Sequence, residues 1–154
     1  MEQIRGTSGA VILAACLLAV PGCDTSGKAG EARAGAASDA SGRHSTLAGV
    51  YTAEQATYGK DVYEQFCYSC HLALNNHAGP VFRQHWAGRG LSEFFTYISV
   101  MMPKNDPGTL SPDDNAALTA YLLQLNGMPA GNVAMATDTT KLRAIRIDTA
   151  GSKR

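Results

Sequence analysis

The chain has 154 residues, with 13 Lys and Arg balanced by 13 Asp and Glu, so its formal net charge is zero. This length suits one small domain. The lack of a basic excess argues against a protein that binds nucleic acid. Apolar periodicity covers only part of the chain, so the folded region is small. A core of that size gives only marginal stability unless a covalent or metal cross-link supports the fold.

Residues 1–22 have the pattern of an export signal. Arg5 precedes an apolar run from Ala10 to Val20, which is shorter than the roughly 20 residues that a membrane-spanning helix needs. Val20-Pro21-Gly22-Cys23 resembles a bacterial lipoprotein processing site, at which Cys23 would become the lipidated first residue. We therefore expect a lipid anchor on the periplasmic side of a bacterial membrane. Cleavage by the ordinary signal peptidase, which would leave a soluble periplasmic protein, is the alternative.

Three regions are expected after the leader. Residues 23–53 are rich in Gly, Ala and Ser, which predicts a flexible tether. Thr52 to Gln55 fits a capping box, and apolar residues at helical spacing follow it, so residues 54–127 should form the folded domain. Residues 128–154 read as a C-terminal tail of weak pattern, with one strand-like stretch from Leu142 to Ile147.

Within residues 54–127 the pattern predicts an all-α fold of three main helices. The first follows Thr52, and residues 72–90 show no clear period and read as a loop. The second runs from Leu91 or Ser92 to about Val100 and must end by Met102, because a residue before proline avoids the α region. Ser111 is a suitable cap for the third helix, which Asn126-Gly127 should stop.

The chemistry of the chain concentrates at Cys67-Tyr68-Ser69-Cys70-His71. Of the four cysteines, Cys16 lies in the leader and Cys23 at its end, which leaves Cys67 and Cys70 for the domain. Cys-x-x-Cys-His is the attachment sequence of c-type haem. Two cysteines three apart on one helical turn can each bind a vinyl group of the porphyrin, and His71 then lies beneath the iron as an axial ligand.

Three other kinds of site compete for this motif. A zinc site would need a second pair of ligands at finger-like spacing, which His77 and His85 do not provide. A thioredoxin-like redox pair would need a βαβ context, and a plain disulfide would leave His71 without a role. Covalent haem c therefore accounts best for the motif.

A second axial ligand would come from Met101, Met102, His77, His85 or Met128. Met102 continues the apolar face of the second helix and could belong to the core. The following Pro103 favours it as a ligand, since proline ends the helix there and holds Met102 in a rigid extended segment.

The stretch from Gly59 to Gly127 resembles the class I cytochrome c family. The resemblance rests on motifs in family order: Gly59 to Tyr63, Cys67 to His71, Gly79-Pro80, Met102-Pro103, and Leu110-Ser111 leading into Ala120-Tyr121-Leu122. It implies a compact cytochrome c fold around one covalent haem, with His71 and Met102 as axial ligands. Because two methionines stand side by side, Met101 is an alternative to Met102. The resemblance also implies that Pro80 offers its carbonyl to the His71 ring and that Trp86 lies by the propionates. Gly59 and Tyr63 would pack against the last helix at Tyr121.

The short spacing between His71 and Met102 looks like the compact bacterial type. The end of the domain is similar to c-type subunits that accompany periplasmic dehydrogenases. The resemblance thus implies an electron carrier without catalytic activity of its own, which takes electrons from a dehydrogenase and passes them to a terminal oxidase or another cytochrome. The alternative is a haem enzyme subunit or sensor with an open sixth position at the iron.

Overall fold

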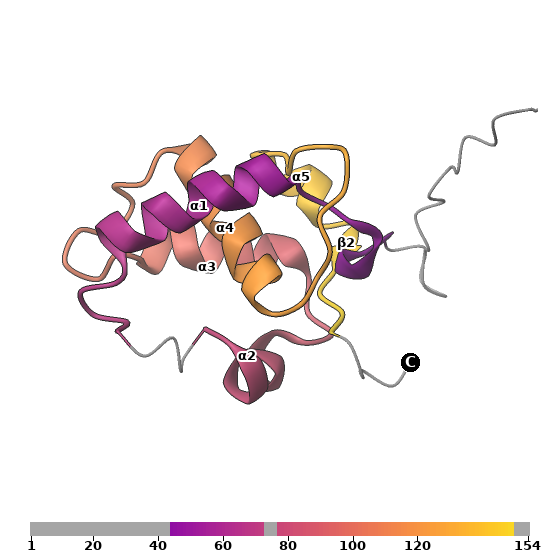
Figure 1. Cartoon of the computed structure of the whole chain (residues 1–154), viewed down its shortest axis with the longest axis horizontal. Helices are drawn as coiled ribbons and strands as arrows, with labels where there is room; N and C mark the ends of the chain where they lie inside the picture. Colours follow the sequence, from indigo (N-terminus) through magenta and orange to yellow (C-terminus); the bar gives the residue numbers. More distant parts are fainter. Residues whose placement is uncertain (1–43, 73–76, 150–154) are drawn as a thin grey trace, which may run out of the picture. The chain divides into compact units, whose positions relative to one another are not determined.

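The computed structural model describes residues 44–72 and 77–149, and this part of the chain is mostly helical. The predictions for the export signal, for lipidation at Cys23 and for the tether up to residue 43 lie outside the described residues. Five helices make up the framework (Figure 1): α1 (Ala53–Phe66), α2 (Gly79–Trp86), α3 (Leu91–Met101), α4 (Pro112–Leu125) and α5 (Thr139–Leu142). A short 3-10 helix, η1 (Thr46–Ala48), and two strands, β1 (His44–Ser45) and β2 (Ile145–Arg146), complete the described elements. The all-α prediction is confirmed.

The three main helices begin and end close to where local signals predicted. The Thr52 hydroxyl accepts a hydrogen bond from the Gln55 amide at 3.2 Å and caps α1. The Ser111 hydroxyl does the same for the Asp114 amide at 3.1 Å, at the start of α4. Helix α3 ends at Met101, and Met102 is extended, with φ −128° and ψ 150°.

Helices α1 and α4 form the most extensive pairing of the fold. A Cβ atom built on Gly59 would lie 1.8 Å from the carbonyl oxygen of Ala117, so only glycine allows the two helices to approach this closely. Farther along the same face, the rings of Tyr63 and Tyr121 are 5.5 Å apart. The expected packing of Gly59 and Tyr63 against the last helix is thereby confirmed.

Residues 79–86 correct the prediction of an unstructured loop, because they form helix α2. Gly79 has a φ of +65° and Pro80 occupies the first turn, where a missing amide proton costs nothing. Phe82 is buried, and its ring meets that of Phe94 edge-on at 5.4 Å. This packing stabilises an eight-residue helix whose own periodicity is too short to reveal it.

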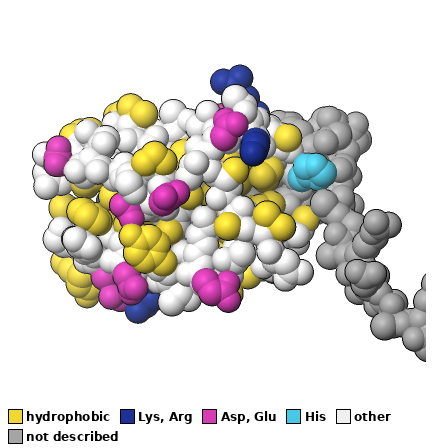
Figure 2. All heavy atoms as spheres, turned by 90° about the horizontal axis from the view of Figure 1, so that it is seen from above, with side chains coloured by type: hydrophobic (Ala, Val, Ile, Leu, Met, Phe, Trp, Pro, Cys, Tyr) yellow, Lys and Arg dark blue, Asp and Glu magenta, His cyan; other side chains and the backbone are white. Residues whose placement is uncertain are grey.

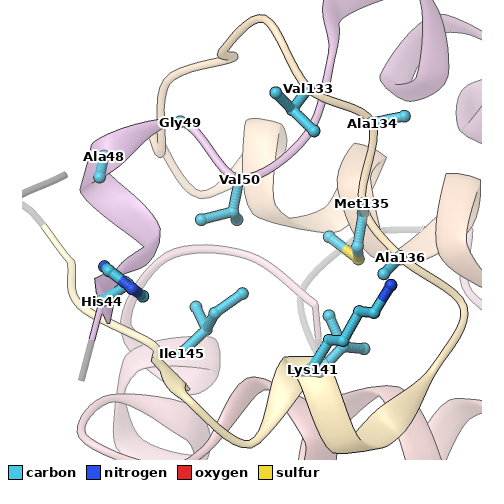
Figure 3. Close-up of a pocket in the computed structure, with 11 residues that line it drawn as sticks. His44, Ala48, Gly49, Val50, Val133, Ala134, Met135, Ala136, Lys141 and Ile145 are labelled. Atoms are coloured by element: carbon cyan, nitrogen blue, oxygen red, sulfur yellow. The ribbon is translucent and has the colours of Figure 1, made fainter. Parts of the chain in front are cut away.

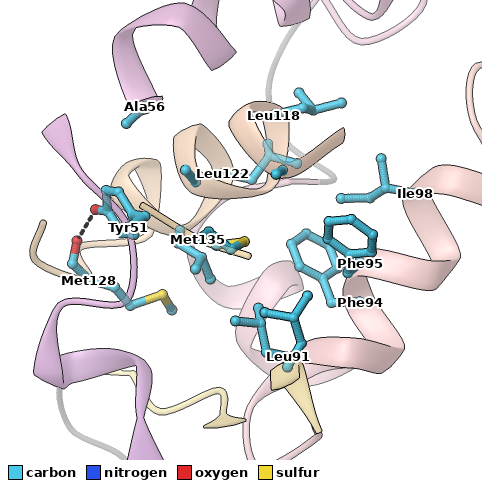
Figure 4. Close-up of a cluster of buried hydrophobic side chains, with 14 of the residues drawn as sticks. Tyr51, Ala56, Leu91, Phe94, Phe95, Ile98, Leu118, Leu122, Met128 and Met135 are labelled. Atoms are coloured by element: carbon cyan, nitrogen blue, oxygen red, sulfur yellow. Dashed lines mark hydrogen bonds between the residues drawn. The ribbon is translucent and has the colours of Figure 1, made fainter. Parts of the chain in front are cut away.

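The segments that flank the predicted domain are folded rather than loose. Strands β1 and β2 pair in parallel, and the Thr46 hydroxyl bonds both to the carbonyl and to the amide of Asp148. Tyr51 is fully buried and donates a hydrogen bond to the Met128 carbonyl (Figure 4). Residues 44–53, which were expected to belong to a flexible tether, are thus ordered, and the tail of weak pattern is folded at residues 128–149. Strand β2 does fall within the stretch predicted to be strand-like.

A small cavity of about 270 Å³ lies between these two flanking segments (Figure 3). Its lining is mainly apolar and includes Val50, Val133 and Met135. The buried side chains of Met128, Leu142 and Ile147 extend this apolar region. Through it the two ends of the described chain pack against the core that contains α3 and α4.

The surface gives two further observations. On the face shown in Figure 2, acidic side chains are scattered among exposed hydrophobic ones, without a continuous basic patch among the described residues on that face. Among residues 44–72 and 77–149, no helix combines the length and the apolar character needed to cross a membrane.

Candidate haem site

A cavity of about 920 Å³ opens between α1, α2, α3 and α4. This volume falls within the range of about 300–1,000 Å³ that is usual for cofactor pockets. The walls are apolar, as a dry redox site requires, and each helix contributes to them: Phe66, Val81, Trp86, Phe94, Ile98, Leu118 and Leu122.

Cys67, Cys70 and His71 all line this cavity. Helix α1 ends at Phe66, so the two cysteines lie on the turn that follows rather than on the helix itself. The amides of Cys70 and His71 bond to the Cys67 carbonyl at 3.1 and 3.0 Å, which closes the turn. This turn brings both thiols and the imidazole to the same cavity, and the two cysteines are not joined in a disulfide.

The cavity separates the five candidates for the second axial ligand. Met102, His77 and His85 line it. Met101 does not line it, and its side chain is 50% exposed. Met128 is buried in the core, away from the cavity lining.

His77 lies directly against His71, with ring centroids 4.0 Å apart. Among the residues that the structure describes, the buried Nε2 of His77 finds no hydrogen-bond partner. Burial lowers the pKa of His71, and the nearby Lys104 lowers it further. Burial and the neighbouring His71 lower the pKa of His77 to about 4. Both imidazoles are therefore neutral at pH 7, the form in which histidine ligates a metal.

The thiol of Cys67 is poorly suited to redox exchange as a free group. Burial, with a smaller contribution from Cys70, raises its pKa to about 11. Disulfide-exchanging cysteines in Cys-x-x-Cys motifs have depressed pKa values, since the thiolate is the reactive form. The electrostatics of Cys67 thus argue against the thioredoxin-like reading of the motif.

Charged and polar side chains gather near Trp86 at the cavity. The Arg89 guanidinium stacks over the Trp86 ring at 4.6 Å and pairs with the Glu93 carboxylate at 2.7 Å. Arg89, Glu93 and Lys104 all line the cavity. Pro80 is exposed in the first turn of α2 and does not line the cavity, so its expected carbonyl contact with His71 stays a prediction.

The residues present fit a covalently attached porphyrin. One apolar cavity collects two thiols, an imidazole and a thioether, together with cationic groups suited to acidic substituents. The unpartnered buried nitrogen of His77 also indicates a site shaped for a bound group.

Residues 54–122 match the family model described as cytochrome c oxidase, cbb3-type, subunit III. The match covers just under half of the chain and includes the Cys67–His71 motif and Met102. It supports a c-type cytochrome domain, which implies a covalently bound haem c, haem-based electron transfer and redox partner proteins in general. No curated protein and no solved structure matches the chain.

Several residues of the site carried no readable signal in the sequence. The Tyr63 hydroxyl donates to the His71 carbonyl at 2.8 Å, although its spacing marked it only as a helix-packing residue. Nothing in the sequence singled out Arg89 or Lys104, which also line the cavity. Asn126 looked like a helix stop, yet it bonds to the segment that begins at His77.

Proposed function

We propose that the chain is an electron carrier with a single haem c, bound covalently by Cys67 and Cys70 and ligated by His71 and Met102. The observation that carries this proposal is the shared lining of one apolar cavity by all four of these side chains. The sequence contains one Cys-x-x-Cys-His motif, which accounts for one haem.

When bound, the haem supplies reversible one-electron exchange. The chain's own residues bind, orient and shield it. Tyr63 fixes the backbone of His71, and the helix end at Pro103 fixes Met102. With a haem bound, the His71 imidazole and the Met102 thioether would hold the iron and leave no position for a substrate. The chain would then support electron transfer without catalysis of its own.

We further propose a periplasmic location, with Cys23 lipidated and the chain anchored at a bacterial membrane. The processing-site resemblance at Val20 to Cys23 supports this location. The resemblance of the domain's end to dehydrogenase-associated subunits supports a periplasmic dehydrogenase as electron donor. A terminal oxidase or another cytochrome is the proposed acceptor.

Haem staining after denaturing electrophoresis tests covalent attachment. The wild-type chain, expressed with its leader and the haem-attachment machinery, should stain. Replacing both cysteines, Cys67→Ser with Cys70→Ser, should abolish the stain without removing the band. A colourless wild-type band under these conditions would overturn the haem proposal.

The axial ligand is tested by a matched pair of methionine variants. Met102→Ala should remove the near-infrared band that marks Met–Fe(III) coordination. Met101→Ala should keep it, because the Met101 side chain is half exposed and outside the cavity lining. Absence of the band from the wild type would instead favour the haem enzyme or sensor with an open sixth position.

A further inference from the structure

Asn126 makes three hydrogen bonds at the end of α4, and two of them leave its own helix. Its Nδ2 donates to the Leu122 carbonyl at 2.8 Å, which is an ordinary way to end a helix. The same Nδ2 donates to the His77 carbonyl at 2.7 Å, and its Oδ1 accepts from the Gly79 amide at 2.9 Å. An amide is the group that can do this, since it offers donors and an acceptor together.

The segment that Asn126 holds lies beside the proposed iron ligand. His77 is the first described residue of this segment, and its ring lies 4.0 Å from that of His71. The ring of His77 also meets that of Tyr63 edge-on at 6.1 Å. Tyr63 in turn donates to the His71 carbonyl. Tyr63 therefore holds the backbone of His71, and the His71 ring is bounded by a segment that Asn126 fixes.

We propose that Asn126 is a positioning residue for haem ligation, which acts through His77 and Gly79 to set the orientation of the His71 imidazole. This inference rests on the proposed function, since it takes His71 as an iron ligand. Groups behind a metal-bound histidine set its orientation and basicity, and their loss typically costs about 10–100-fold in metal affinity or activity.

The structure also supplies a matched control in Gln55. Its side-chain amide makes the same kind of two-point contact with a distant segment, accepting from the Met135 amide at 2.8 Å and donating to the Met135 carbonyl at 3.3 Å. Neither Gln55 nor Met135 lines the haem cavity. Loss of the Gln55 contact removes comparable hydrogen bonds without touching the surroundings of His71.

The test compares Asn126→Ala, Asn126→Asp and Gln55→Ala in the full chain. Each is first stained for haem, and then its ferric electron paramagnetic resonance spectrum is recorded. The ratio of reduced to oxidised protein is also measured at one fixed ambient potential. We expect Asn126→Ala to shift this ratio about tenfold toward the reduced form. A misoriented imidazole donates less electron density to the iron, and this loss destabilises the ferric form more than the ferrous form. The ferric spectrum of Asn126→Ala should change, since that spectrum reports the plane of the axial imidazole.

Asn126→Asp keeps the acceptor for Gly79 but loses both donated bonds, so its ferric spectrum should change as that of Asn126→Ala does. Its ratio is not compared, because the added carboxylate charge by itself favours the ferric form. Gln55→Ala should leave the ratio and the ferric spectrum as in the wild type, whatever it does to stability. A haem-bearing Asn126→Ala variant with wild-type ratio and spectrum would overturn the inference and leave the haem proposal intact.

If the Asn126 variants fail to fold, the wild type still decides. Its Gly79 amide proton should be protected from hydrogen exchange, and a Gly79 amide that exchanges like an exposed one would overturn the inference. A wild type without covalent haem would instead overturn the proposed function itself.

Discussion

Gly59 is the residue on which the closest helix contact depends. A Cβ atom there would lie 1.8 Å from the Ala117 carbonyl oxygen, and this oxygen belongs to backbone that cannot rotate away. Gly59→Ala should therefore force α1 and α4 apart, at a cost of about 3 kcal/mol in the free energy of unfolding or more. Denaturant unfolding of the haem-loaded protein measures this.

Asp61→Ala is the control for Gly59→Ala. It lies on the exposed side of the same helix, so its effect should stay within about 0.5 kcal/mol. Equal stability of the Gly59 and Asp61 variants would contradict the packing described for α1 and α4.

At the scale of single residues, the haem-binding motif could be predicted because its chemistry is local. Two cysteines and a histidine in a row of five are typical of c-type haem attachment, and the neighbouring Pro103 marked Met102 as a candidate ligand. The residues that surround these candidate ligands could not be predicted. Asn126 lies next to a glycine at a helix end, and its role as a helix stop already accounts for its presence there. Its bonds to His77 and Gly79 are tertiary contacts, which no local pattern indicates.

At the scale of elements, the N-terminus of α4 depends on Ser111. Its hydroxyl accepts from the Asp114 amide at 3.1 Å and donates to the Asp114 carboxylate at 2.7 Å. Ser111→Ala should lower the free energy of unfolding by about 1 kcal/mol. Ser99→Ala, within α3, should be close to neutral, and a loss there as large as at Ser111 would contradict the capping role.

Asp114 should give this same helix start a pH dependence. The Tyr58 hydroxyl bonds to its carboxylate, and this bond, followed by the Ser111 hydroxyl, lowers the pKa of Asp114. A depressed folded-state pKa means that the ionised form stabilises the fold. The contribution is complete above the unfolded value of about 3.9 and is lost as the pH falls through the folded value.

Asp114→Asn should therefore flatten the loss of stability below about pH 4. The effect should stay under about 1 kcal/mol, because the pair is solvated. Thermal unfolding between pH 2 and pH 6 (a range set by the reference value of about 3.9) measures it. Tyr58→Phe should reproduce part of the flattening. If Asp114→Asn lost stability in acid as steeply as the wild type does, the role given to the Asp114 carboxylate would be contradicted.

The elements that were predicted correctly are those with a clear local signal at one end or at both. Thr52 and Ser111 cap α1 and α4, and Pro103 sets the end of α3. Helix α2 was missed because eight residues hold about two turns, too few for a period to emerge. Its stability comes from the packing of Phe82 against Phe94 in α3, which no local pattern encodes.

At the scale of the whole molecule, the C-terminal segment of the described chain packs on the loop after α2 and also pairs with the N-terminal segment. The Gly88 amide donates to the Ile147 carbonyl at 2.8 Å, and the Ile147 amide donates to the Arg89 carbonyl at 2.9 Å. Strand β2 also pairs with β1. The sequence could not predict this arrangement, because the partners lie far apart along the chain. It places the segment next to Trp86 and Arg89, both of which line the haem cavity.

The family match stops at residue 122, but the core continues beyond the motifs. Tyr51, Met128, Met135, Leu142 and Ile147 are all buried, and none lies between residues 54 and 127. Burial of one such side chain is worth about 1.5–3 kcal/mol. Five of them together rival the whole net stability of about 5–15 kcal/mol that is typical of a domain.

A fragment of residues 54–127 should consequently fail to fold as a stable domain, whereas residues 44–149 should behave like the full chain. Both are to be exported behind the same leader, and thermal unfolding followed by circular dichroism is compared with haem content per chain. We expect the shorter fragment to show no cooperative transition and a haem content well below one per chain. It lacks the buried Tyr51, Leu142 and Ile147, and its α3 surface faces water where α5 and β2 packed against it. If the fragment of residues 54–127 unfolded cooperatively with a midpoint temperature within a few degrees of that of residues 44–149, the flanking segments would not be needed for a stable domain.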